Sequence, residues 1–117
     1  MSRALPTKPF VVQVKALEAA GLTIGLVSRV RASLKPIANQ VIRSASSVPA
    51  NIAEGSGRFG RDRVHHWRIA YGSAKEVDVH LRLLLHAYAV DQVAADKALN
   101  QFDEVRAMLW RLIHPVA

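Results

Sequence analysis

The chain has 117 residues, half of them hydrophobic, which suits a single domain (1–117) with a core of its own. It contains no cysteine, which excludes disulfide bonds, a thiolate nucleophile and cysteine metal sites. Without a signal peptide or a run of about 18 apolar residues, we expect a cytoplasmic protein with no membrane contact, and the net charge of +7 permits a nucleic-acid partner.

Four segments with helical periodicity follow one another along the chain, and no segment predicts a strand. We predict helices at about residues 8–31, 35–57, 61–88 and 91–114. Long helices joined by short turns are typical of up-down topology. The sequence therefore predicts an all-α fold, an antiparallel up-down four-helix bundle.

The first helix has apolar or small residues at steps of four and three, and we expect this stripe to face the core: Phe10, Val14, Leu17, Gly21, Ile24 and Ser28. Gly21 and Gly25 form a pair of small residues that would let a bulky neighbour, such as Trp67 or Trp110, approach the backbone. Ser33 follows in the turn and is the predicted N-cap of the second helix.

A proline interrupts the second helix. Apolar spacing continues from Val48 to Ile52, past Pro49, so we predict one helix that is bent at Pro49 rather than two short helices. The glycine-rich stretch Gly55–Gly60 ends the helix. Asp91 is the predicted N-cap of the fourth helix.

Two helices carry more apolar surface than one bundle face needs. The third helix is apolar almost all round at residues 81–87, and such a helix has to be covered on more than one side. A chain of this length offers nothing further to cover it, so we expect self-association. The residues expected at the oligomer interface are Leu22, Leu26, Leu83 and Leu85. An ordinary, broad core stripe is the alternative.

Polar residues recur at helical spacing on flanks of the second and third helices that could face each other: Ser47, Asn51, Glu54, Ser73 and Glu76. Buried polar groups need partners, so we predict a structural network that fixes the register of the two helices. The alternative is a small polar site with Glu54 or Glu76 as acid or base. Because no nucleophile, phosphate loop or metal-ligand spacing accompanies them, we expect no enzyme, no metal and no cofactor.

Up-down topology gathers positive charge at one end of the bundle. The start of the chain, the turn between the second and third helices and the end of the fourth helix all lie there. This end collects Arg58, Arg61, Arg63, Arg68, His65, Lys8 and Arg111. With Phe59 and Trp67 close by, it could hold phosphates and stack a base. The alternative is a solvated basic end that keeps an oligomer soluble.

Residues 47–58, Ser-Val-Pro-Ala-Asn-Ile-Ala-Glu-Gly-Ser-Gly-Arg, resemble the signature S-[IV]-P-x-N-I-A-E-G-x-G-R of a bacterial four-helix bundle family. This family includes proteins encoded in intervening sequences of large-subunit ribosomal RNA genes and the accessory variability determinants of diversity-generating retroelements. Residues 40–45 resemble the family's lead-in, with Ser44 where alanine is usual, and residues 70–77 resemble its A-x-G-S-x-x-E-L motif. Asp78 and His80 depart from the usual continuation.

The resemblance covers about residues 8–114 and implies a bundle that assembles as a homopentamer. It also implies structural or interfacial roles for Asn51, Glu54, Arg58, Ser73 and Glu76. Members that act with a reverse transcriptase bind nucleic acid through basic surfaces. The resemblance therefore implies RNA, DNA and a reverse transcriptase as candidate partners. We therefore expect a non-enzymatic oligomeric bundle that binds nucleic acid, RNA first, through the basic end. The alternative is an assembly protein that binds a protein partner and has no nucleic-acid role.

Overall fold

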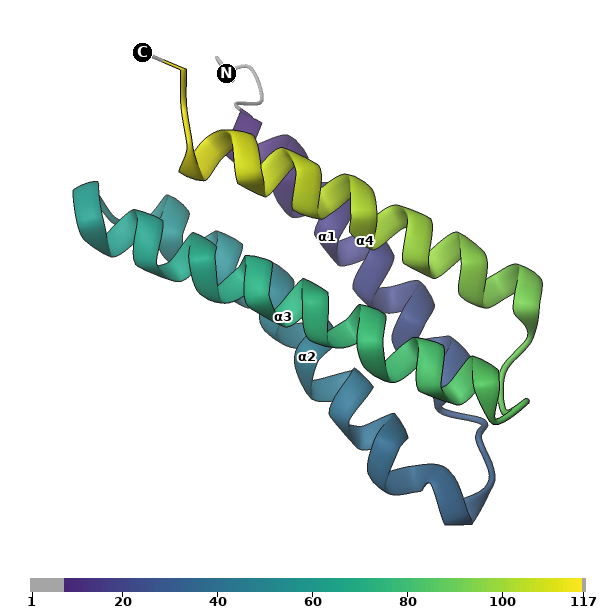
Figure 1. Cartoon of the computed structure of the whole chain (residues 1–117). Helices are drawn as coiled ribbons and strands as arrows, with labels where there is room; N and C mark the ends of the chain where they lie inside the picture. The colour runs from purple at the N-terminus through teal and green to yellow at the C-terminus, as the bar shows by residue number, and fades with distance from the viewer. Residues whose placement is uncertain (1–7, 117) are drawn as a thin grey trace, which may run out of the picture.

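The computed structural model describes residues 8–116, which contain four α-helices and no strand. The helices are α1 (Lys8–Val27), α2 (Lys35–Ser56), α3 (Gly60–His86) and α4 (Gln92–Ile113), with the short 3₁₀ helix η1 (Ala32–Leu34) before α2. Both α1 and α3 pack against α2 and α4, and successive helices run in opposite directions (Figure 1). This arrangement confirms the predicted all-α, up-down four-helix bundle.

The helix ends agree with the prediction to within two residues, except at the end of α1. The helix α1 ends at Val27, four residues early, where the Ser28 hydroxyl donates to the Gly25 carbonyl at 2.8 Å. The predicted N-cap Ser33 is wrong, because α2 has Leu34 at its N-cap and no capping side chain. Asp91 does cap α4, since its carboxylate accepts the Ala94 N–H at 2.9 Å.

The helix α2 runs through Pro49 without a break, as the apolar spacing predicted. Proline has no N–H to donate to the carbonyl four residues earlier. Packing compensates, because Val48, Pro49 and Ile52 are all buried. The bend at Pro49 stays a prediction.

On α2, α3 and α4 the buried residues are those that recur in the sequence at steps of three and four, whereas α1 differs from its predicted stripe. On α1 the buried residues are Val12, Ala16, Ala19, Ala20, Thr23 and Val27. The predicted core stripe is therefore wrong, because Val14, Leu17 and Gly21 lie on the exposed side. Both faces of α1 are apolar or small, so periodicity alone could not say which of them faces inward.

The two glycines of α1 do not admit a bulky neighbour. A Cβ added at Gly21 or Gly25 would meet nothing within 4 Å. The prediction that Trp67 or Trp110 approaches them is wrong.

Three of the four residues expected at an oligomer interface already pack inside one chain. Leu22, Leu26 and Leu85 are half-buried against the core, and only Leu83 is exposed. Exposed apolar side chains also lie on the outer side of α1, where Val14 and Leu17 face solvent, and on α3, where Val79 accompanies Leu83.

The segment Phe10–Val27 of α1 is long and apolar enough to span a membrane by length and composition. The segment is not an unbroken apolar run, because it contains Gln13, Lys15 and Glu18, and a core helix of a soluble protein can have the same composition. Here one side of α1 packs in the bundle core against α2 and α4. Its apolar character therefore comes from a buried face combined with an apolar outer face.

We predict that Asp91→Ala lowers the free energy of unfolding by about 1 kcal/mol, because it removes the side-chain acceptor at the N-terminus of α4. Urea denaturation at a fixed protein concentration measures this effect. Ser33→Ala is the matched control, since Ser33 caps no helix, and it should change stability by less than about 0.5 kcal/mol. Equal effects of the two changes would contradict the capping assignment.

Candidate nucleic-acid interface

The hairpin of α2 and α3 closes on a contact between a tryptophan and a glycine. A Cβ added at Gly55 would lie 2.5 Å from Cδ1 of Trp67 and 2.9 Å from the Arg63 carbonyl oxygen, so only glycine fits. The buried Trp67 indole donates its N–H to the Ile52 carbonyl at 3.3 Å. This contact gives the glycine of the sequence motif a packing role.

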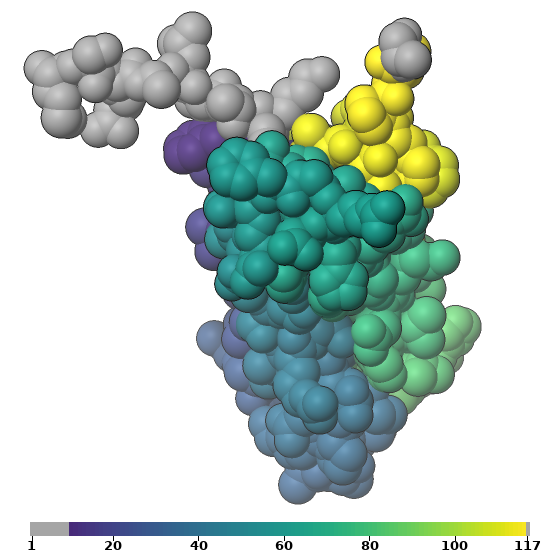
Figure 2. Space-filling model, turned by 90° about the vertical axis from the view of Figure 1, so that its left-hand side faces the viewer, coloured from purple at the N-terminus to yellow at the C-terminus, as the bar shows by residue number. Residues whose placement is uncertain are grey.

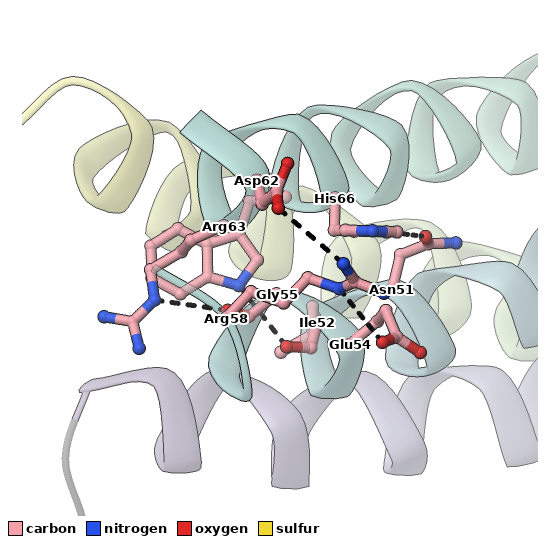
Figure 3. Close-up of polar contacts among 9 residues, drawn as sticks. Asn51, Ile52, Glu54, Gly55, Arg58, Asp62, Arg63 and His66 are labelled. Carbon is pink, nitrogen blue, oxygen red and sulfur yellow. Dashed lines mark hydrogen bonds and ion pairs between the residues drawn. The ribbon is translucent and has the colours of Figure 1, made fainter. Parts of the chain in front are cut away.

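Arg63 covers the same contact from outside. Its Nε donates to the Gly55 carbonyl at 3.2 Å (Figure 3). Its Nη2 donates to the Ser56 carbonyl at 3.1 Å, so Arg63 satisfies two carbonyls at the C-terminal end of α2. Its guanidinium lies 5.4 Å from the centroid of the Trp67 ring. Arg63 thus holds the hairpin together, and its Nε and Nη2 donors are occupied by backbone carbonyls.

A chain of hydrogen bonds between polar side chains also links α2 to α3. The Asn51 amide donates to both the Ser47 carbonyl and the Ser47 hydroxyl at 3.0 Å, and the Ser73 hydroxyl donates to the Ser47 hydroxyl at 2.9 Å. The Asn51 carbonyl oxygen lies 3.1 Å from Nδ1 of His66 (Figure 3). Three of the five predicted network residues therefore meet, and His66 joins them.

The two glutamates of the predicted network lie outside it. Glu54 is exposed and accepts from Nε of Arg58 at 3.1 Å, and Nη1 of Arg58 lies 3.8 Å from Asp62 (Figure 3). The Glu76 side chain is exposed, and only its backbone carbonyl has a contact, at 3.0 Å from Nδ1 of His80. Arg58 is thus held by carboxylates, and neither glutamate lies in an enclosed site.

Within residues 8–116, three arginines predicted for nucleic-acid binding are exposed and have no hydrogen-bond or ionic partner: Arg61, Arg68 and Arg111. Arg61, His65 and Arg68 line one shallow hollow on the outer side of α3. Figure 2 shows this end of the bundle, where the start of α3 lies beside the end of α4. Lys8 begins α1, but its side chain lies outside the described residues.

Other cations are neutralised within the bundle. Lys15 pairs with Glu104, whose hydrogen bond and charge raise the pKa of Lys15 above its ordinary value. Arg82 donates to Asp78 at 2.6 Å, and this hydrogen bond likewise raises the pKa of Arg82. Lys15 and Arg82 are therefore already paired with carboxylates, unlike the three arginines at the basic end.

The aromatic residues near the basic end differ from those predicted. Trp67 is 4% exposed and cannot stack on a ligand, whereas Phe59 is exposed at the α2–α3 turn. Trp110, on α4, is 52% exposed and was missed as a site residue. The signal that could have found it is spacing, because Trp110 falls outside the stripe of Phe102, Val105 and Leu109 that is buried on α4.

No group of three metal-ligating side chains occurs among residues 8–116. The nearest histidine rings, those of His65 and His66, lie 5.3 Å apart in an edge-to-face arrangement. The chemistry that the exposed arginine and histidine side chains offer is hydrogen bonding from guanidinium and imidazole donors to an anion.

We predict that Gly55→Ala lowers the free energy of unfolding by about 1–3 kcal/mol, because the new methyl group overlaps Trp67 and the Arg63 carbonyl. Chemical denaturation followed by circular dichroism tests this. Gly57→Ala is the matched control: its φ of −86° suits alanine and its nearest neighbour would be 3.8 Å away. A change at Gly55 no larger than the change at Gly57 would refute the tight contact.

Comparison with known proteins agrees with the motif at residues 47–58. A family model described as 23S rRNA-intervening sequence protein matches residues 11–111. A solved structure from Bacteroides thetaiotaomicron, a protein with unknown function from the S23 ribosomal protein family, has 27% sequence identity and a TM-score of 0.83, covering 92% of this chain and 98% of that chain. The search of curated proteins gave no match. Neither description names an enzyme, and the chain belongs to the 23S rRNA-intervening sequence protein family.

Proposed function

We propose that this protein binds RNA through its basic end and that it acts without catalysis. Of the residues predicted at that end, the ones that we assign to binding are Arg61, His65, Arg68 and Arg111. The observation that carries the proposal is the presence of three exposed arginines without partners at one end of the described bundle. Unpaired guanidinium groups lose little when they exchange water for phosphate, and they release counterions from the nucleic acid.

The fold favours this surface for a second reason. Because Trp67 faces the core, the neighbouring residues of α3 on the other side project into solvent, and Arg61, His65 and Arg68 share one hollow there. The net charge of +7 adds a long-range attraction for a polyanion. Local geometry and overall charge therefore support the same kind of partner.

We predict that Arg61→Glu together with Arg68→Glu weakens RNA binding about tenfold or more and reduces the slope of affinity against salt by about two. The measurement is a gel shift with a folded 23S rRNA fragment at several salt concentrations. Light scattering on the same samples checks that the oligomeric state is unchanged.

The control carries an equal change of charge at the other end of the bundle. Arg29 and Lys97 are exposed and have no ionic partner among the described residues, so Arg29→Glu with Lys97→Glu should leave affinity within about twofold. Equal losses in both double variants would mean that total charge, not the basic end, drives binding. No binding of the unchanged protein at low salt would leave the assembly function below as the better proposal.

A second function, assembly with copies of itself, is favoured by the outer side of α1. Leu17 is 55% exposed and Val14 is exposed one turn before it. Leu17 borders a hollow between α1 and α2 whose other apolar or small lining residues include Ala20, Gly21, Ile24, Pro49, Ala50 and Ala53. Exposed apolar surface of this kind is typical of a protein contact. We propose that a second copy covers it, and the family resemblance implies five copies in all.

We predict that Leu17→Glu reduces the mass measured by light scattering to that of one chain, because a carboxylate cannot be buried in an apolar contact without a partner. Val93→Glu is the control, since Val93 is exposed on α4, away from this face, and it should leave the mass unchanged. A monomeric unchanged protein, or an oligomer that tolerates Leu17→Glu, would exclude the proposed interface.

A further inference from the structure

Three aromatic rings form a row on the outer side of α3 and α4, beside the basic end. The Trp110 and His114 ring centroids are 3.7 Å apart with an interplanar angle of 32°, so His114 covers one face of the indole. Tyr71, from α3, lies 6.1 Å from the Trp110 centroid at 49°. The backbone fixes the row, because Nδ1 of His114 lies 3.1 Å from the Trp110 carbonyl oxygen. Although His114 lies against one face of the indole, 52% of the Trp110 surface stays exposed to solvent.

Cations surround this row. Arg111 lines the same hollow as Tyr71 and Trp110, and Arg68 lies one turn before Tyr71 on α3. Neither arginine has a hydrogen-bond or ionic partner in the described chain. The Lys75 ammonium lies 6.0 Å from the centroid of the Tyr71 ring.

One carboxylate also borders the hollow. Asp103 lines it, but Asp103 is hydrogen-bonded to Arg106, which lines it too. Since Arg106 offsets Asp103, Arg111 leaves the hollow with a net positive charge. The net charge of the hollow therefore attracts an anionic group.

A flat aromatic face flanked by guanidinium groups is the arrangement with which proteins hold unpaired nucleotides. The aromatic ring stacks on the base, and the cations take the phosphates on either side. In a duplex the bases already stack on each other, so only a single strand, loop or bulge can present a base to Trp110.

We propose that Trp110 is a stacking platform for a base in an unpaired stretch of RNA, with Arg68 and Arg111 holding the adjacent phosphates. This inference rests on the proposed RNA binding and adds the class of RNA. It also assigns a role to Arg111, which does not line the hollow formed by Arg61, His65 and Arg68 but lies next to Trp110.

Fluorescence tests the inference, because Trp110 is half-exposed and the other tryptophan, Trp67, is buried. A single-stranded RNA oligonucleotide should quench Trp110 emission and bind about tenfold more tightly than the same oligonucleotide annealed to its complement. Trp110→Ala should weaken single-strand binding about five- to a hundredfold and change duplex binding little. Trp110→Phe should restore most of the affinity, since it keeps a ring in place.

Tyr88→Ala is the control, because Tyr88 is an exposed aromatic residue at the opposite end of the bundle, and it should leave binding unchanged. Equal binding of single strand and duplex with no effect of Trp110→Ala would overturn the stacking role while RNA binding stands. No binding of either RNA at low salt would instead remove the proposed function itself. A change of oligomeric mass in Trp110→Ala would place Trp110 in a subunit contact and also overturn the inference.

Discussion

The contact between Trp67 and Gly55 is the constraint on which the rest of this structure depends. It lets α2 and α3 approach closely beside the turn that joins them, and the indole N–H bond to Ile52 fixes their register there. With Trp67 directed inward, the other side of the first turns of α3 has to face solvent. The row of basic residues that we assign to RNA is therefore a consequence of how the hairpin closes.

The polar residues around that contact serve the fold more than a ligand. Asn51 uses its amide to connect Ser47 with His66, and Arg63 satisfies carbonyls at the end of α2. Buried or half-buried polar groups hold their geometry only when every partner is present, which explains why the motif combines several residue types over one short stretch. In the proposed function, RNA binding falls to the cations that these contacts do not use.

Two surfaces of the molecule are thus distinct in chemistry. The basic end offers unpaired guanidinium groups and an exposed indole, whereas the outer side of α1 offers apolar side chains and small residues. A bundle can expose both because each α-helix buries only one stripe in its own core. Assembly through one surface would leave the other free, and several copies side by side would present several basic ends to one RNA, which raises the effective concentration of sites.

The sequence by itself determined the four helices, the bundle topology, the cap at Asp91 and the inward faces of α2, α3 and α4, because polar residues on their other faces give the pattern contrast. It also identified the family through residues 47–58. Only the tertiary structure decided which face of α1 is buried, since both are apolar and the pattern has no contrast there. It alone separated Arg63 from Arg61, because the carbonyls that Arg63 contacts lie on α2, and periodicity along α3 carries no information about them.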